Sequence, residues 1–283
     1  MKRIIQYIIS TILALSIITL TIVNIFSSTI LNKEYILSKL QEQNYYDKIY
    51  EEVESNFENY IHQSGLDEEV LEGIVTKKKI QDDTTIIINN IYDGIDEKIS
   101  TEEIRNNLKE KINNSIEGKI STSQQQSIDT FIDTICNEYE TTISHTNYEK
   151  KINSIINKLN KYLSLTKKGL TIIMIISVIS LILLTLKNIY EMVSKIGIAF
   201  VIDGLILILS EKYICSKIKI DTIIILNKGI SDVLQSILKE ILANILKSGS
   251  IMLGLGISLV IIYGIIKSIC KVRREKEQYT IEN

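Results

Sequence analysis

Few side chains in this sequence could carry out chemistry, and the one placed most unusually is a carboxylate. Asp203 lies at the midpoint of the run KIGIAFVIDGLILILSE, whose other residues between Lys195 and Glu211 are apolar or uncharged. An ionised acid at the centre of a membrane costs about 2.5–3.5 kcal/mol, so such groups face the helix bundle and find partners there. Asp203 is therefore predicted either to bind an ion or a proton, or to fix helix packing through a hydrogen bond. The candidate hydrogen-bond partners are the uncharged polar residues of the other apolar segments: Asn24, Ser177, Thr185, Ser258 and Tyr263.

The histidines and cysteines form no catalytic or metal-binding pattern. His62 and His145 are the only two histidines, and neither HExxH nor CxxC occurs, so no metal site is predicted. No GxSxG, Walker-type or GxGxxG motif is present, so no cofactor is expected and an enzyme is not favoured, although acids assembled only in space leave no spacing signature. Cys136 and Cys215 either form a disulfide in an oxidising compartment or remain free thiols.

Four apolar segments must position these residues. They are residues 4–32, 169–186, 196–210 and 248–266. About 20 apolar residues in a helix cross a bilayer, and the first segment is too long for a cleaved signal peptide, which predicts an uncleaved anchor. The third segment is short. It reaches spanning length only if Lys195, Glu211 and Lys212 extend their charged ends to the membrane surfaces.

The basic residues predict the orientation of these segments. Lys2 and Arg3 precede the first segment and KVRREKE, residues 271–277, follows the fourth. Lys and Arg near the ends of spans stay in the cytoplasm, so both termini are predicted to be cytoplasmic, with residues 33–165 outside the cell membrane. The loop 211–247, also placed outside, carries six lysines and argues against this topology. The tail is the denser cluster and is preferred.

Residues 33–165 are predicted to form a helical domain. Apolar residues recur about every four positions along its first part: Ile36, Leu40, Ile49, Val53, Phe57 and Ile61. Thr76 is expected to cap a helix that ends near Gly94, and Ser100 with Glu103 matches a capping box for the next helix. The first and last helices are predicted to continue into the first and second spans. The chain has no Pro, which suits long helices.

One stretch of this domain resembles a known kind of protein. Residues 44–73, NYYDKIYEEVESNFENYIHQSGLDEEVLEG, are similar to the extracytoplasmic region of uncharacterised integral membrane proteins from low-GC Gram-positive bacteria. The similarity covers roughly residues 35–110 and is one of composition and layout. It implies an extracytoplasmic helical region between membrane spans, with no activity to carry over.

The last part of the chain holds two helix faces of interest. Residues 231–247 are predicted to form an amphipathic helix, capped by Ser231, that lies in the membrane surface or packs against the helical domain. On the fourth span, Ser250, Gly254 and Ser258 place small residues one turn apart, a pattern that lets helices approach closely. This face is expected either to pack within the chain or to join two copies as a homo-oligomer.

The sequence therefore predicts an all-α membrane protein of four transmembrane helices with an inserted extracytoplasmic helical domain. Its parts are an anchor at 1–32, the domain at 33–165, and three further spans with a basic cytoplasmic tail at 166–283. Residues 31–168 carry 17 Lys and Arg against 25 Asp and Glu, a net charge of −8, while the remainder carries +6.

This charge pattern, with no concentrated basic patch, does not favour nucleic-acid binding. The expected function is non-enzymatic. The domain would bind a partner or ligand, most simply a protein of the membrane or envelope, in an assembly, sensing or support role, and the lipid bilayer would hold the spans. The alternative is a transporter or channel-like component in which Asp203 is the ion or proton site.

Overall fold

The computed structural model describes residues 2–64, 66–116, 121–144, 149–186, 188–225 and 227–281. All regular secondary structure within these ranges is helical, so the prediction of an all-α protein is confirmed. The chain divides into two compact units. Unit 1 comprises residues 1–29, 160–223 and 237–283, and unit 2 comprises residues 30–159 and 224–236.

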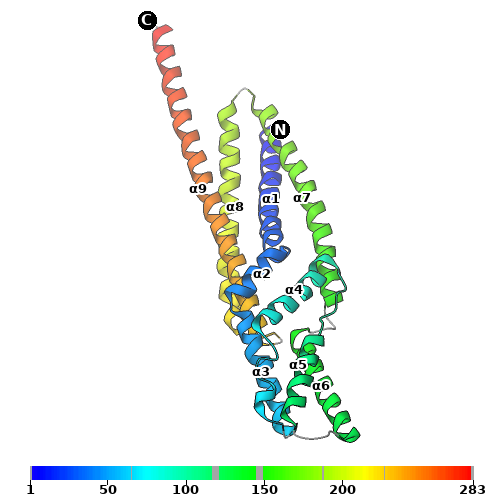
Figure 1. Ribbon diagram of the computed structural model, residues 1–283. Helices are drawn as coiled ribbons and strands as arrows, with labels where there is room; N and C mark the ends of the chain where they lie inside the picture. Colours follow the sequence, from blue (N-terminus) through cyan, green and yellow to red (C-terminus); the bar gives the residue numbers. More distant parts are fainter. Residues whose placement is uncertain are drawn as a thin grey trace. The chain divides into compact units, whose positions relative to one another are not determined.

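Unit 1 is built from four helices that are long and apolar enough to span a membrane. They are α1 (Lys2–Ser28), α7 (Glu149–Thr185), α8 (Ile189–Lys217) and α9 (Lys228–Ile281), with the 3-10 turn η2 (Ile220–Thr222) between the last two. The first residues of α7 and of α9 belong to unit 2. Figure 1 shows the start of α1 and the last turns of α9 at the same end of unit 1. The prediction of four helices able to span a membrane is thus confirmed.

The apolar side chains of these four helices mostly face outward. Only 11% of the most apolar part of α9 is buried, and Ile176 and Leu183 on α7 are 58% and 62% exposed. Inside, Leu13 and Leu181 are buried in a small core that joins α1 to α7. A contiguous apolar surface of this size is not stable in water, so a lipid bilayer is its natural surrounding.

The helix that contains the third apolar segment, residues 196–210, extends beyond it on both sides. α8 has 29 residues, which at 1.5 Å per residue is about 43 Å and exceeds the hydrocarbon core of about 30 Å. The ammonium of Lys195 lies 3.2 Å from the centroid of the Tyr7 ring on α1, a cation–π contact. Glu211, predicted to extend to the membrane surface, is instead buried.

The predicted amphipathic helix at 231–247 is not a separate element, because α9 runs without a break from Lys228 through the fourth span. In unit 2 its first turns pack on α3. The carboxylate of Asp232 lies 2.6 Å from the ammonium of Lys48, and packing against the helical part, one of the two predicted placements, is therefore confirmed for these turns. Asn227 rather than Ser231 caps the helix, since its side chain accepts a hydrogen bond from the Ile230 N–H at 2.9 Å.

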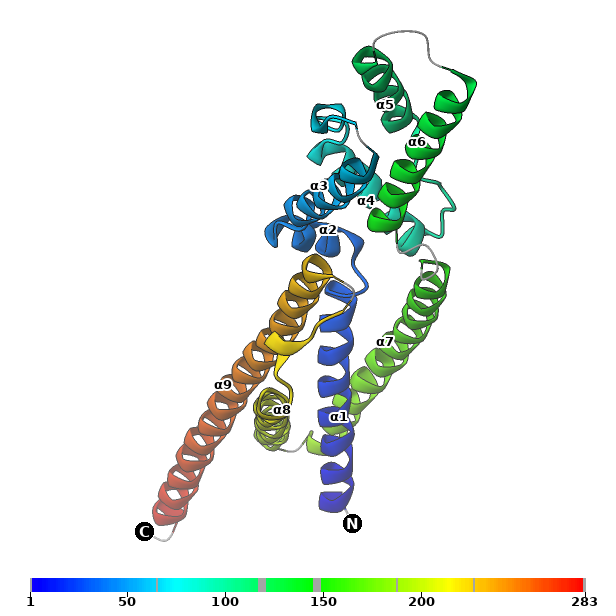
Figure 2. The same cartoon turned by 90° about the horizontal axis from the view of Figure 1, so that it is seen from below.

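Unit 2 packs short amphipathic helices around an apolar core. They are α2 (Lys33–Glu42), α3 (Tyr45–Ser64), the 3-10 turn η1 (Glu68–Val70), α4 (Lys77–Asp93), α5 (Glu102–Ser115) and α6 (Thr122–Ile143). Figure 2 separates α5 and α6 from α3 most clearly. The core includes residues from each of the larger helices, with relative exposures of 0–1%: Ile49, Ile80, Ile104, Leu108, Ile132 and Ile135.

The helix boundaries confirm some predicted signals and correct others. Thr76 caps α4 by accepting from the Lys79 N–H at 3.1 Å, and Gly94 ends it in the left-handed region with φ of 71°. The capping box predicted at Ser100 is wrong, because the N-cap position is Thr101 and makes no side-chain capping bond. A capping box is present instead at Ser121 on α6.

Only one of the two predicted continuous helices exists. α7 runs through from Glu149 into the second span as predicted. The first span ends at Ser28, and Asn32 caps a new helix by accepting from the Tyr35 N–H at 3.1 Å. A second break occurs at Asn44, whose φ of 52° is left-handed, and it divides the predicted helix of residues 36–61 into α2 and α3.

A buried polar network lies inside the apolar core of unit 2. The hydroxyl of Tyr139 on α6 donates to the Asp83 carboxylate on α4. The ammonium of Lys79 donates to Asp83 at 3.0 Å and to the carbonyl of Ser100 at 3.0 Å. Burial raises the pKa of Tyr139 above its ordinary value, and the bond to Asp83 adds to the rise, so the hydroxyl stays protonated and remains a donor. The network therefore ties α6 to α4 at one register.

Removing Asp83 should destabilise unit 2 more than removing the hydroxyl of Tyr139. In Asp83→Ala the partly buried ammonium of Lys79 loses its buried carboxylate partner, which costs up to about 3–5 kcal/mol. Tyr139→Phe keeps the ion pair and loses one hydrogen bond, at a cost of about 1–3 kcal/mol. Hydrogen exchange of α4 and α6 in the purified full chain measures both. The exposed neighbour Asp82→Ala should change stability by less than about 0.5 kcal/mol, and equal losses in all three variants would contradict the network.

Candidate functional site

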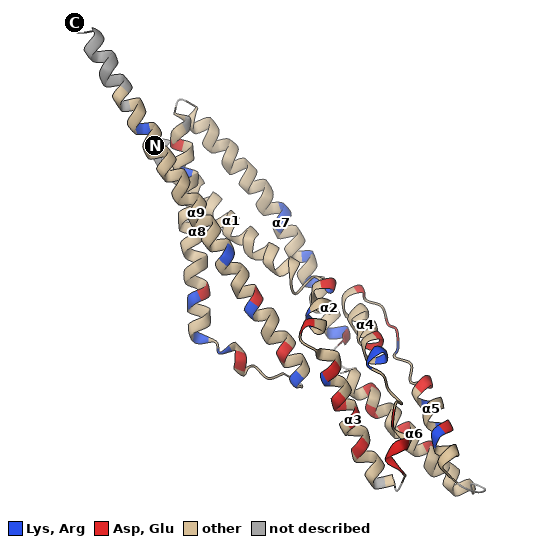
Figure 3. Cartoon of the chain, turned by 60° about the vertical axis from the view of Figure 1, so that its left-hand side comes forward, with Lys and Arg blue, Asp and Glu red and all other residues tan. Residues whose placement is uncertain are grey.

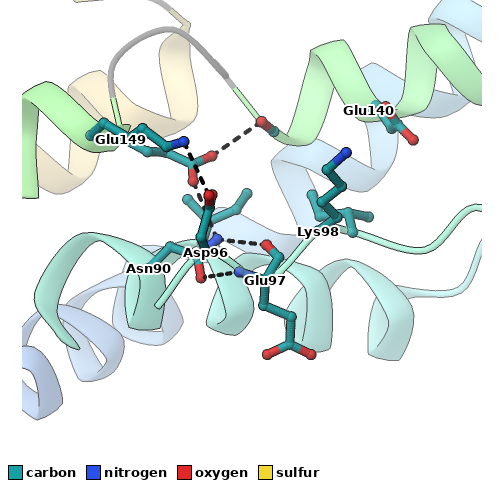
Figure 4. Close-up of a pocket in the computed structure, with 10 residues that line it drawn as sticks. Asn90, Asp96, Glu97, Lys98, Glu140 and Glu149 are labelled. Carbon is teal, nitrogen blue, oxygen red and sulfur yellow. Dashed lines mark hydrogen bonds and ion pairs between the residues drawn. The ribbon is translucent and has the colours of Figure 1, made fainter. Parts of the chain in front are cut away.

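A polar pocket of about 310 Å³ lies in unit 2 where several segments meet. Asn90 of α4, Asp96 and Lys98 of the segment after it, Glu140 of α6 and Glu149 of α7 line it (Figure 4). Carboxylates, an amide and an ammonium in one pocket could in principle bind a polar ligand. Whether they can do so depends on how many of them are already paired.

Most polar groups of this pocket bond to one another. The Asn90 amide donates to the carbonyl of Glu97 at 2.7 Å and accepts from its N–H at 3.2 Å. Glu149 accepts from Asn90 at 3.3 Å and from Ser144 at 3.1 Å, and Lys150 pairs with Asp96 at 3.1 Å. Figure 4 shows Asn90 bonded to Glu97 beside the Glu149 carboxylate. The pocket is therefore best described as a joint that holds α4, α6 and the start of α7 together.

A second pocket of unit 2, also about 310 Å³, has a different character. Its floor is apolar, formed by Phe57 and Ile61 of α3, both buried, and by Leu71 after η1. Five glutamates line the same pocket: Glu54, Glu58, Glu68, Glu69 and Glu72. All five are exposed, and Figure 3 shows the red acidic positions along α3 and the segment that follows it. These eight residues are called the acidic groove below.

Little positive charge offsets the acidic groove within the described chain. The imidazole of His62 lies 3.7 Å from the carboxylate of Glu68. The ammonium of Lys111 donates to the backbone carbonyls of Glu69 and Glu72, and not to their carboxylates. The groove therefore combines an apolar floor with a rim of negative charge, a surface that complements a cationic group attached to an apolar one.

In unit 1, the structure buries Asp203 completely, with 0% of the residue exposed. It shares a stripe of α8 with Ala199 and Leu207, one turn before and one turn after it, which are 1% and 2% exposed. Neither carboxylate oxygen has a hydrogen-bond partner among the described residues. An uncompensated charge buried in this way is costly, so this position disfavours the ionised carboxylate.

The partners predicted for Asp203 do not bond to it. The hydroxyl of Thr185 donates to the carbonyl of Leu181 at 2.6 Å, and that of Ser258 donates to the carbonyl of Gly254 at 2.9 Å. Tyr263 stacks on Tyr190 with ring centroids 6.2 Å apart. A hydrogen bond between Asp203 and another span is thus not formed in the structure, and a role as an ion or proton site stays a prediction.

Next to Asp203, the backbones of α8 and α9 come into direct contact at glycines. A Cβ added to Gly204 would lie 2.6 Å from the backbone nitrogen of Leu253 and 2.7 Å from the carbonyl oxygen of Gly249. Two turns away, a Cβ added to Gly256 would lie 2.8 Å from the carbonyl oxygen of Gly197. Pairs of glycines at a spacing of seven on both helices thus permit an approach that any side chain would block.

The predicted packing face of the fourth span points elsewhere. Ser250, Gly254 and Ser258 are exposed, and a Cβ added to Gly254 would meet nothing within 4 Å. Packing of this face within the chain is therefore not observed in the described residues, since Gly249 and Gly256 make the contact with α8 instead. Homo-oligomerisation through the exposed face stays a prediction.

The cysteines and histidines are placed apart from these features. Cys136 and Cys215 are both free, so the predicted disulfide is not formed. Each thiol already has a partner within its own unit, because Cys136 donates to the carbonyl of Thr101 at 3.9 Å and Cys215 to Glu211 at 3.2 Å. His145 lies outside the described residues. No three His, Cys, Asp or Glu side chains gather as a metal site in the described part of the chain.

A methyl group at Gly204 should disrupt the membrane helices, whereas one at Gly254 should not. Gly204→Ala forces backbone atoms of α8 and α9 apart and should cost about 1–3 kcal/mol, as overpacking does. Gly254→Ala meets only open space and should be neutral or stabilising by up to about 1 kcal/mol, because Ala favours helix more than Gly. Thermal unfolding of the purified chain in detergent compares them. Equal stability of the two variants would show that the glycine contact does not form.

Neither the acidic groove nor the glycine contact was predicted from the sequence, although it contains all the residues that form them. Glutamates at 54 and 58 and at 68, 69 and 72 are separated in the chain, and only the turn after α3 brings them together. The spacing of seven between Gly197 and Gly204, repeated at Gly249 and Gly256, is the signal that could have identified the contact. Searches found no family model, no curated protein and no solved structure that matches the chain.

Proposed function

We propose that the chain is a non-enzymatic, multi-pass protein of the cell envelope membrane that binds a partner protein through the acidic groove of unit 2. The observation that carries the proposal is the groove itself, in which five exposed glutamates surround the buried Phe57 and Ile61. The four apolar helices of unit 1 anchor the protein in the bilayer. Its role is to assemble, sense or support a larger complex.

The charge at the helix ends supports an extracytoplasmic position for unit 2. Lys2 and Arg3 begin α1, and the basic run 271–277 lies in the last part of α9. Basic residues next to spans favour the cytoplasmic side. The connection from α7 to α8 at the same end is only residues 186–188, so this connection holds no domain that could pass on a signal, and such a signal would need a second protein.

The chemistry of the groove restricts the kind of partner. Exposed carboxylates attract Lys and Arg, increase the rate of encounter and select against acidic surfaces. The apolar floor adds affinity only if the partner also brings an aliphatic or aromatic side chain. The expected partner segment therefore carries two or more basic residues next to one apolar anchor. Individual surface ion pairs contribute little, so recognition depends on the cluster acting together.

A second function, ion or proton transport, is favoured by one specific observation. Asp203 is fully buried in unit 1 and has no hydrogen-bond partner in the described residues. A carboxyl group kept without a partner contributes no packing bond, and intramembrane acids of this kind commonly carry ions or protons. Transport pathways usually contain several such groups, and Asp203 with the buried Glu211 makes two on α8.

Reversing the charge of the groove should abolish partner binding without unfolding the protein. A photo-crosslinking residue at Leu71, in the full chain expressed in its native membrane, should give a specific crosslinked product. The triple variant Glu68→Lys, Glu69→Lys and Glu72→Lys should reduce that product at least about tenfold, because each reversal replaces attraction by repulsion. The change exceeds what loss of any single pair would cause.

The matched control carries the same change in net charge on α5. Glu102, Glu103 and Glu110 are exposed there, and their replacement by Lys should leave the crosslink intact. A cysteine at Glu58 in a Cys215→Ser background should react with a membrane-impermeant reagent in intact cells. The proposal fails if both triple variants behave alike, or if that cysteine reacts only after lysis.

The transport function is tested by Asp203→Asn, which keeps the shape of the side chain and removes its acidity. In proteoliposomes with an imposed proton gradient, the wild type should conduct protons. The rate of proton flux should be at least about tenfold lower in Asp203→Asn. Its thermal unfolding should be unchanged or improved, because no hydrogen bond is lost. Gly254→Ala is the control for reconstitution. Proton flux that is no faster than in empty vesicles, or is equal in both proteins, excludes this function.

A further inference from the structure

Unit 1 contains a cavity of about 780 Å³ that none of the features above uses. All four membrane helices line it, through residues such as Asn24 of α1, Lys167 of α7, Phe200 of α8 and Lys247 of α9. Its volume lies within the range of small-molecule sites, about 300–1,000 Å³. The residues around it differ from one end to the other, and this asymmetry indicates what it could hold.

One end of the cavity is cationic and rich in hydrogen-bond donors. The ammonium groups of Lys167 and Lys247 have no ion-pair partner in the described chain, and no Asp or Glu lines the cavity. Asn24, Asn244 and Ser248 add neutral donors beside them. Two unpaired lysines with amide and hydroxyl donors are suited to bind a phosphate or another anion.

The other end of the cavity is apolar. Ile251, Met252 and Leu255 of α9 follow Lys247 at intervals of about one to two turns, roughly 6–12 Å along the helix. Lys167 and Lys247 stand where the apolar runs of α7 and α9 begin, at the level expected for lipid head groups. The cavity therefore offers positive charge at the membrane surface and apolar wall toward the membrane interior.

We infer that this cavity binds an anionic membrane lipid. The phosphate of the lipid lies between Lys167 and Lys247, and the upper part of one acyl chain lies along Ile251, Met252 and Leu255. Zwitterionic lipids lack the net charge that two unpaired lysines select. A free anion would satisfy the lysines but not the apolar wall, so the lipid is the ligand that uses both ends. This inference is independent of the partner proposed for the acidic groove.

The absence of Trp from the chain permits a local test. A single Trp replacing Met252 reports on the cavity, and one replacing the exposed Ile261 reports on lipid around the protein. Quenching by brominated phosphatidylglycerol and by brominated phosphatidylcholine is compared in vesicles that contain the full chain. The quenching of Met252→Trp should show that the anionic lipid binds there in preference to the zwitterionic one by well over fivefold. At Ile261→Trp the two lipids should quench equally. Leu255→Trp replaces Met252→Trp if the latter fails to fold.

The lysines are then tested in the Met252→Trp background. Lys167→Gln and Lys247→Gln should each lower the preference by about fivefold, since each surface lysine contributes about one such factor to anionic-lipid binding. The control Lys168→Gln with Lys267→Gln removes two charges that do not line the cavity and should change nothing. Equal quenching by both lipids at the cavity overturns the inference, and so does an equal effect of the control and of the double variant that combines Lys167→Gln with Lys247→Gln. Full displacement of the lipid by millimolar inorganic phosphate would also overturn it, because the site would then select a free anion.

Discussion

The backbone contact between α8 and α9 determines how the rest of unit 1 is arranged. Lipid chains are as apolar as the side chains of these helices, so helices associate in a membrane mainly through close packing and not through the hydrophobic effect. Gly204 against Gly249, and Gly197 against Gly256, provide such packing because no side chain separates the backbones. The contact fixes the rotation of both helices. It leaves Asp203 on a buried stripe and turns Ser250, Gly254 and Ser258 outward.

Unit 2 is held together by different forces, because its helices are amphipathic and bury one apolar stripe each. Ile49, Ile80, Ile104 and Leu108 are fully buried, and their removal from water provides most of the stabilisation. Apolar contacts allow one helix to shift along another, whereas hydrogen bonds between the helices do not. The bonds from Tyr139 and Lys79 to Asp83 are directional, so they select one register of α6 on α4 that isoleucine packing alone would not specify.

The two units offer opposite charges. Unit 2 concentrates exposed glutamates beside Phe57 and Ile61, and unit 1 places Lys167 and Lys247 just before the apolar runs of α7 and α9. In each case an apolar surface adjoins the charge, so the ligands proposed for them combine an apolar part with the opposite charge. A basic protein segment suits the first surface and an anionic lipid suits the second. A protein with both would bind its partner while its membrane helices select the surrounding lipid.

The amino-acid sequence by itself determined the features that depend on neighbours in the chain. Hydropathy and length predicted four helices able to span a membrane, and Thr76 and Gly94 marked the ends of α4, because capping uses atoms a few residues apart. It did not predict the break at Asn44, since the apolar spacing continues on both sides of it. Only the tertiary structure decided that Gly249 and Gly256, and not Gly254, meet α8, that Asp203 lacks a partner, and that distant glutamates share one groove. These outcomes depend on the rotation and approach of whole helices, which local sequence leaves open.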